Sequence, residues 1–116
     1  MLTRIVVPAV MLAFAATQAA AAAPGQKLNE TEIRAALVGH EVTGIPPKGK
    51  KWTALYADDG TVKYGDGKTG TWAIKGGQFC DFPKGDKEYC RTVVQLNDKK
   101  VQMVKPDGSK GSVVSW

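Results

Sequence analysis

Residues 70–96 read GTWAIKGGQFCDFPKGDKEYCRTVVQL, and this stretch decides the fold. It contains three short runs rich in aromatic and β-branched residues, separated by the pair Gly76-Gly77 and by the turn sequence at 83–86. Turns this short leave no room for a crossover helix, so consecutive strands must pair antiparallel. The stretch therefore predicts a meander with strands near 70–75, 78–82 and 88–96.

The two cysteines of the chain lie on either side of the second turn. That turn centres on Gly85, so residues whose numbers add to 170 face each other, and Cys80 faces Cys90. A pair of this kind suits a disulfide. No C-x-x-C motif is present, which argues against a redox role. We predict a structural disulfide between Cys80 and Cys90.

The same alternation of short strands and turns extends in both directions along the chain. Further turn signals lie near 45–49, 58–60, 65–67, 97–99 and 106–108. Seven turns imply about eight strands, and a sheet of that size avoids open edges by curling. We predict a mainly β domain, an antiparallel meander that forms a small barrel or half-barrel. Its other strands are expected near 41–45, 51–57, 61–64, 100–105 and 111–115.

One short helix is expected before the first strand. Asn29 is a suitable N-cap, and Glu32 lies three residues later in capping-box spacing. Gly39 is a natural stop. A helix of about two and a half turns is marginal alone, so it should pack on the sheet and cover one end of the barrel. Its apolar residues are Leu28, Ile33, Ala36 and Leu37.

Residues 1–22 have the layout of a cleavable secretory signal peptide. Arg4 precedes the uncharged run 5–16, IVVPAVMLAFAA, which is shorter than the roughly 20 residues that span a bilayer. Small residues follow in an alanine-rich stretch, so we expect cleavage near Ala22/Ala23. The predicted location is the periplasm or the secreted fraction.

Processing would leave residues 23–27 as a flexible leader and 28–116 as a single disulfide-bonded β domain. The alternative is an uncleaved membrane anchor, which Pro8, Thr17 and Gln18 disfavour as a stable span. We expect no integral membrane association after cleavage. A processed chain of about 94 residues is long enough for one modest core and too short for a second domain.

The charge balance indicates a mildly basic surface. Without Arg4 the chain has 15 Lys and Arg against 11 Asp and Glu, a net of +4, and 13 of the basic residues are lysines. Nucleic-acid readers cluster their basic residues and favour arginine. Here the lysines are spread between acidic residues. We therefore expect no nucleic-acid partner, and we expect a monomer.

Three motifs suggest chemistry, and each has a simpler structural explanation. The Gly-Lys-Thr sequence at 67–69 resembles the end of a phosphate-binding loop, but Val62 occupies the place of its first glycine and a strand follows. The Asp-Asp-Gly sequence at 58–60 is typical of a hairpin turn. His40, the sole histidine, has no partner for a metal site or a triad. We predict no catalytic residues, no metal site and no cofactor.

Three aromatic residues are candidates for a ligand-facing surface. Trp52 and Tyr56 share one strand face, and Trp72 lies on a later strand. In a domain this small, such residues more often belong to the core. If the barrel opens on one side, they could instead line a groove for a sugar or an apolar ligand.

The chain resembles small Cys-paired periplasmic β proteins of unknown function from Gram-negative bacteria. The resemblance covers most of residues 28–104 and rests on a helix with the pattern E-I-x-x-x-L-x-G, followed by a Cys-paired meander. It implies the fold and the compartment, and it brings no known active site. Its elements are LNETEIRAALVG at 28–39, Trp52 with Tyr56, DGT at 59–61, GTWAI at 70–74, Cys80, Cys90 and Val93.

Together these features predict an exported, non-catalytic β domain that binds a protein, a glycan or a small ligand. An inhibitor of a hydrolase is one concrete version. The alternative is a small periplasmic enzyme with a shallow site near Tyr56, Asp58 and Tyr64. A cavity with convergent Asp, Tyr or His side chains would favour the enzyme, whereas a filled interior with an exposed aromatic patch would favour binding.

Overall fold

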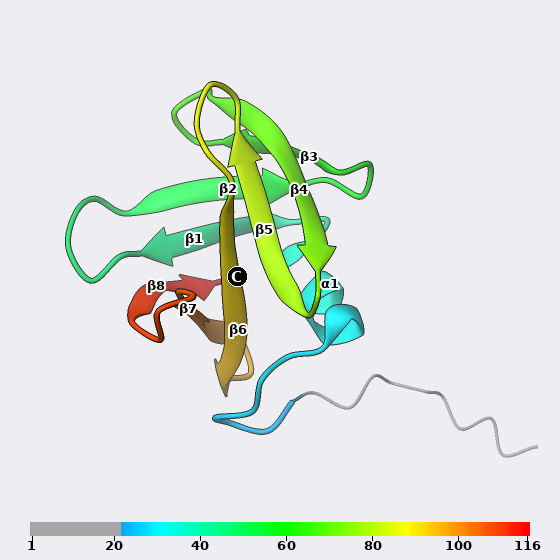
Figure 1. The fold of residues 1–116 in the computed structure, drawn as a ribbon, viewed down its shortest axis with the longest axis vertical. Helices are drawn as coiled ribbons and strands as arrows, with labels where there is room; N and C mark the ends of the chain where they lie inside the picture. The colour runs from blue at the N-terminus through cyan, green and yellow to red at the C-terminus, as the bar shows by residue number, and fades with distance from the viewer. Residues whose placement is uncertain (1–21) are drawn as a thin grey trace, which may run out of the picture.

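Eight antiparallel strands form a closed barrel in the computed structural model, which describes residues 22–116 (Figure 1). Each strand pairs with the next along the chain, and the first strand closes the barrel against the last through pairs such as Gly44 with Val114. The strands are β1 (Glu41–Ile45), β2 (Trp52–Tyr56), β3 (Thr61–Tyr64), β4 (Thr69–Lys75), β5 (Gln78–Pro83), β6 (Tyr89–Asn97), β7 (Lys100–Val104) and β8 (Lys110–Ser115).

The predicted meander is confirmed, and the structure selects the closed barrel over the half-barrel. Each predicted strand lies within one residue of the observed bounds at either end. The predicted register of the β5–β6 hairpin is also confirmed, because Phe79 pairs with Arg91 and Asp81 with Tyr89. The signal peptide predicted for residues 1–22 falls, except for Ala22, outside the described residues.

The one helix, α1 (Glu30–Leu37), begins and ends where the sequence predicts. The Asn29 side chain accepts a hydrogen bond from the Glu32 backbone N–H at 2.9 Å, and the Glu32 carboxylate accepts one from the Asn29 N–H at 2.9 Å. Gly39 follows with φ +88°, a conformation that favours glycine. No helix within residues 22–116 has the length and hydropathy to cross a membrane.

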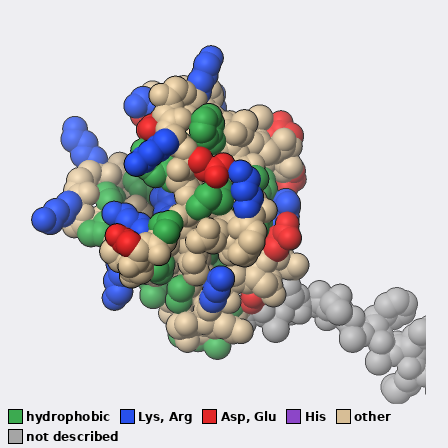
Figure 2. Space-filling model, in the orientation of Figure 1, with side chains coloured by type: hydrophobic (Ala, Val, Ile, Leu, Met, Phe, Trp, Pro, Cys, Tyr) green, Lys and Arg blue, Asp and Glu red, His purple; other side chains and the backbone are tan. Residues whose placement is uncertain are grey.

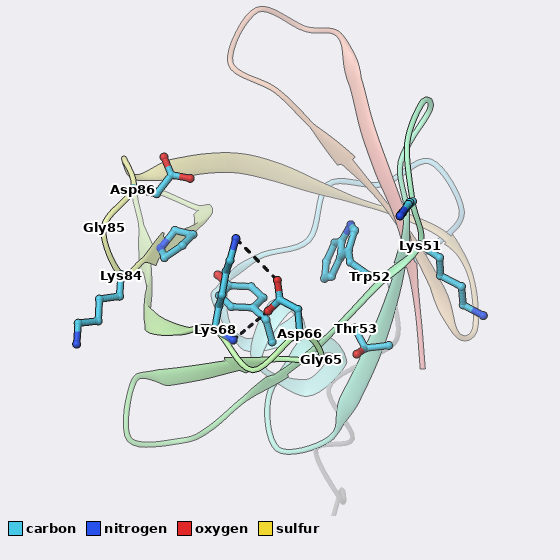
Figure 3. Close-up of a pocket in the computed structure, with 12 residues that line it drawn as sticks. Lys51, Trp52, Thr53, Gly65, Asp66, Lys68, Lys84, Gly85 and Asp86 are labelled. Carbon is cyan, nitrogen blue, oxygen red and sulfur yellow. Dashed lines mark hydrogen bonds and ion pairs between the residues drawn. The ribbon is translucent and has the colours of Figure 1, made fainter.

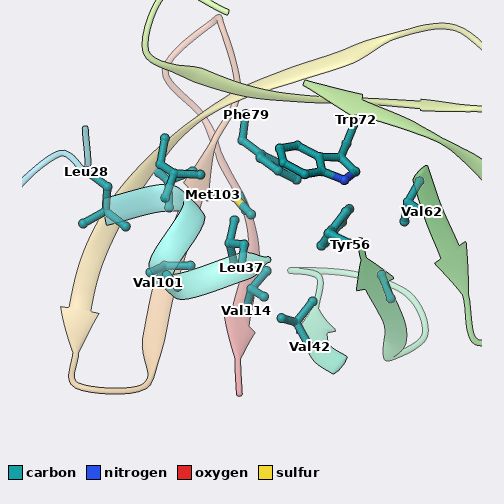
Figure 4. Close-up of a cluster of buried hydrophobic side chains, with 14 of the residues drawn as sticks. Leu28, Leu37, Val42, Tyr56, Val62, Trp72, Phe79, Val101, Met103 and Val114 are labelled. Carbon is teal, nitrogen blue, oxygen red and sulfur yellow. The ribbon is translucent and has the colours of Figure 1, made fainter. Parts of the chain in front are cut away.

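Helix α1 covers one end of the barrel and completes the core there (Figure 1). Ile33 and Leu37 are fully buried on its inner face, and Leu28 is buried just before it. In Figure 4, Leu37 points toward the aromatic and aliphatic side chains that the strands direct inward. The buried residues from the strands include Val42, Tyr56, Val62, Trp72, Phe79, Val93, Val101, Met103 and Val114.

Residues 23–27, expected to be a flexible leader, are hydrogen-bonded to the barrel. The Gly25 N–H donates to the Gln95 carbonyl at 2.7 Å, and the Gln95 N–H donates to the Gln26 carbonyl at 2.9 Å. Lys27 forms an isolated bridge with Val94. Strand β6 extends past the end of β5, so this part of its edge would otherwise lack backbone partners. The leader supplies them.

Cys80 and Cys90 are paired across β5 and β6 and joined by a disulfide, as the sequence predicts. Without reductant, both cysteines should therefore resist alkylation. Reduction opens an eleven-residue loop, and the chain-entropy model gives a loss of about 2–3 kcal/mol in the free energy of unfolding. Denaturant titration with and without reductant measures this loss, and unchanged midpoints would contradict the prediction.

Candidate functional site

The end of the barrel opposite α1 is open and contains a cavity of about 770 Å³. Three loops surround it, which connect β1 with β2, β3 with β4, and β5 with β6 (Figure 3). Its volume falls within the roughly 300–1,000 Å³ typical of small-ligand sites. The lining residues are Lys50, Lys51, Trp52, Thr53, Tyr64, Gly65, Asp66, Lys68, Pro83, Lys84, Gly85 and Asp86.

Trp52 forms one wall of this cavity and is held in a fixed orientation. Its indole N–H donates a hydrogen bond to the Ser112 hydroxyl of β8 at 3.0 Å. The ring lies against Gly44 of β1, where an added Cβ would be only 2.0 Å from the indole. Glycine at position 44 therefore allows the ring to lie across the barrel wall. Half-buried, Trp52 presents an oriented aromatic surface to the cavity.

A polar cluster adjoins the cavity at Tyr64, which lies on the neighbouring strand β3. The Tyr64 hydroxyl donates a hydrogen bond to Asp81 Oδ2 at 2.7 Å, and the other Asp81 oxygen forms an ion pair with Arg91. The Asp81 side chain is 7% exposed and that of Arg91 is 20% exposed. Arg91 Nε is buried and has no hydrogen-bond partner among the described residues. The barrel interior is thus apolar near α1 and polar near the open end.

Asp81 and Arg91 were not singled out from the sequence, although one signal was available. Side chains alternate faces along a strand, so Asp81 shares the inner face of β5 with Phe79, and Arg91 shares the inner face of β6 with Val93. Two opposite charges at inward positions of paired strands are typical of a buried ion pair.

Burial and the neighbouring Asp81 charge raise the pKa of Tyr64 and of Tyr56 above the usual value of 10.0. The folded state therefore holds these protons more tightly than the unfolded state does. Stability from this source is fully present below pH 10 and is lost as the pH rises above it. We expect alkaline unfolding, with tyrosinate absorbance and loss of circular dichroism rising together. Full ionisation of all three tyrosines in a folded barrel would contradict this.

The lysine side chains of the open end differ in direction. Figure 3 shows Lys68 beside Asp66 over the middle of the cavity, whereas Lys51 and Lys84 extend outward from the rim. The Lys68 ammonium lies 3.9 Å from Asp66 Oδ2, and both side chains are mostly exposed. This is a loose surface pair that contributes little stability. It leaves Lys68 free to bind another anion.

The structure separates the three aromatic residues that the sequence offered as ligand-facing. Trp52 lies on the cavity wall. Tyr56 is 1% exposed and Trp72 is 6% exposed, and both pack around Phe79 in the core. The Trp72 indole N–H donates to the Ala57 carbonyl at 2.8 Å, which satisfies it inside the domain. Tyr64 is the second aromatic residue on the cavity wall.

The suggested enzyme site is not assembled, because Asp58 lies apart from Tyr64. Tyr64 lies at the open end of β3, whereas Asp58 is exposed in the β2–β3 turn at the other end of that strand. Tyr56 lies between them in the core. His40 is also near the helix-covered end, where its Nε2 is 2.6 Å from the Ala36 carbonyl.

Two further candidates for chemistry have structural roles. Lys68, in the Gly-Lys-Thr sequence, belongs to a tight turn in which its N–H donates to Asp66 Oδ1 at 2.9 Å. Cys80, Glu88 and Cys90 form a group with metal-ligand spacing. The disulfide removes both thiolates of that group, so it does not offer a metal site.

Comparison of this chain with protein-family models, with curated proteins and with solved structures finds no match.

Proposed function

We propose that this protein is an exported, non-catalytic binding domain whose binding surface is the open end of the barrel. The observation that carries this proposal is the cavity of about 770 Å³ beside the oriented Trp52 ring. The other end of the barrel is covered by α1 and filled with apolar side chains. A half-buried aromatic wall with exposed charged side chains around it suits recognition of a partner.

The cavity is lined by Tyr64, Asp66 and Asp86, which are residue types that an enzyme site could use, but the way these groups are held supports binding over catalysis. Asp81 is buried and both of its oxygens are engaged, one by Tyr64 and one by Arg91, so the carboxylate is not presented to a substrate in the cavity. The raised pKa of Tyr64 keeps its hydroxyl protonated near neutral pH. Within residues 22–116, the exposed carboxylates at the cavity, Asp66 and Asp86, lie in turns and are not paired with a histidine.

Three partner classes remain compatible with this surface: a protein, a glycan and a small ligand. The β1–β2 loop carries Lys48, Lys50 and Lys51 beyond the barrel, and such a loop could enter the acidic cleft of a hydrolase. This is the inhibitor version of the proposal. The concave cavity instead favours a ligand that enters the barrel end.

Solution NMR with the processed protein tests the binding surface. Periplasmic extract, separated into low-mass and macromolecular fractions, is added to the labelled protein. We expect shifts confined to residues around the cavity, in 50–53, 64–68 and 83–86. Changes confined to α1 and the Asn97–Lys99 turn, or no changes with any fraction, would overturn the proposal.

Export is the second half of the proposal. It is supported by the signal-like residues 1–22, by a disulfide that needs an oxidising compartment, and by the resemblance to small periplasmic proteins. N-terminal sequencing of the protein from a periplasmic fraction should give a start near Ala23. Intact Met1 in exported material would support the membrane anchor instead.

A further inference from the structure

The net positive charge of the described chain lies entirely at the open end. The four loops there, with their flanking residues, carry eight lysines and four acidic residues, a net of +4. The rest of residues 22–116 carries seven basic and seven acidic residues, which cancel. Figure 2 shows basic side chains projecting along the upper and left margins, where these loops lie. The lysines are Lys48, Lys50, Lys51, Lys68, Lys84, Lys87, Lys105 and Lys110.

This charge is available to a ligand. Lys50, Lys51 and Lys84 line the cavity, and none of them forms an ion pair within the described chain. Lys68 is held only by its loose contact with Asp66. Positive charges that surround a cavity focus their electrostatic field into it, so these lysines attract anions to the cavity.

The floor of the cavity excludes a lipid chain as the main occupant. Below Trp52 and Tyr64 lie the buried Asp81–Arg91 ion pair and then the core, so a lipid chain entering at the open end would meet buried charges before it met apolar side chains. An occupant must therefore lie across the open end. Its polar groups would face Tyr64 and the lysines, while a flat face would lie against Trp52.

We propose that the open end binds an acidic glycan, with a sugar ring against Trp52 and its carboxylates near Lys50, Lys68 and Lys84. This inference rests on the proposed function and names its ligand class. Sugar rings present an apolar C–H face that packs on an indole, and their hydroxyls accept and donate hydrogen bonds at a polar wall. Lys51 and Lys84 extend beyond the rim, so a chain longer than the cavity would still contact them.

Two other polyanions fit less well. Nucleic-acid sites favour the planar fork of arginine against phosphate, whereas every basic residue lining this cavity is a lysine. An acidic protein would need a broad complementary surface, whereas the lysines here surround a cavity of about 770 Å³, which is the size of a small-ligand site. Oligothymidylate and polyglutamate, which represent these two classes, serve as competing probes in the test.

The test uses trigalacturonate and its fully methyl-esterified form, two trisaccharides with the same sugar backbone, of which the ester lacks the carboxylate charges. Calorimetry on the processed protein should show binding of the acid that weakens with added salt. The ester should bind at least tenfold more weakly. NMR shifts should map to Trp52 and the lysines around the cavity.

Lysine variants at exposed positions test the charge without disturbing the fold. The triple variant Lys50→Gln, Lys68→Gln, Lys84→Gln should lose about tenfold in affinity for the acid, because each exposed pair contributes a few-fold. The matched control is Lys63→Gln, Lys99→Gln, Lys100→Gln, which removes the same charge from outside the cavity. It should bind nearly as well as the wild type.

The outcomes separate this inference from the proposed function. Equal binding of acid and ester at Trp52 would overturn the acidic ligand and leave the binding surface intact. Equal losses in the two triple variants, or tighter binding of oligothymidylate or polyglutamate, would also overturn it. If neither trisaccharide shifts the cavity resonances at millimolar concentration, the acidic-glycan inference is wrong, whereas the proposed function is decided by the extract titration.

Discussion

Replacing Asp81 by alanine is expected to lower the free energy of unfolding by about 3–5 kcal/mol, the cost typical of breaking a buried ion pair from one side. The substitution leaves the Arg91 guanidinium inside the barrel without its carboxylate. Within residues 22–116, Asp81 is the only ion-pair partner of Arg91, and Arg91 Nε has no hydrogen-bond partner. Tyr64 also loses its hydrogen-bond acceptor.

A loss of this size is large for a small domain, whose total stability is about 5–15 kcal/mol. Urea titration of Asp81→Ala against the wild type measures it directly. The double variant Asp81→Leu, Arg91→Met is the control, because it removes both charges and fills the space with apolar atoms. We expect it to regain most of the lost stability, since such replacements are often neutral or stabilising.

Two results would contradict this account of the polar cluster. A loss below about 1 kcal/mol for Asp81→Ala would mean that Arg91 reaches solvent in the folded state. A double variant as unstable as the single one would mean that packing, and not the unpaired charge, dominates. Tyr64→Phe gives an intermediate case, since it removes one hydrogen bond to a charged group and should cost about 1.5–3 kcal/mol.

Local patterns determined how much of the fold could be predicted. Short turns with Gly, Asp or Asn fixed the strand ends, and the glycine at position 85 fixed the register that joins Cys80 to Cys90. Closure of β1 against β8 involves residues some 70 positions apart, and no local pattern specifies it. The sequence alone was therefore compatible with both a half-barrel and a closed barrel.

The candidate site was predicted less well, because it depends on which end of the barrel is covered. Trp52 and Trp72 look equivalent in sequence, yet one lies near the open end and the other lies near α1. The difference depends on which end of the barrel α1 covers. Tertiary packing sets that choice, and no local sequence pattern specifies it. The group of lysines at the open end arises in the same way, because loops that are distant in sequence meet there.

Phe79→Ala should cost about 3–5 kcal/mol, as expected for removing a fully buried aromatic side chain from a packed core. Phe79 is 0% exposed and lies at the centre of the aromatic cluster. Its ring meets Tyr56 edge-on at 4.8 Å and stacks on Trp72 at 5.7 Å. Truncation would leave a cavity lined by both rings, which the rigid barrel wall cannot collapse to fill.

The same strand supplies a matched control for this substitution. Phe82 lies three residues later on the opposite face of β5 and is 45% exposed, so Phe82→Ala should change stability by no more than about 0.5 kcal/mol. Urea titrations of both variants, with near-ultraviolet circular dichroism for the Trp72 environment, measure the difference. If the two variants lost equal stability, the inner and outer faces of β5 would be misassigned. The inward placement of Asp81, which lies on the Phe79 face, would then be wrong too.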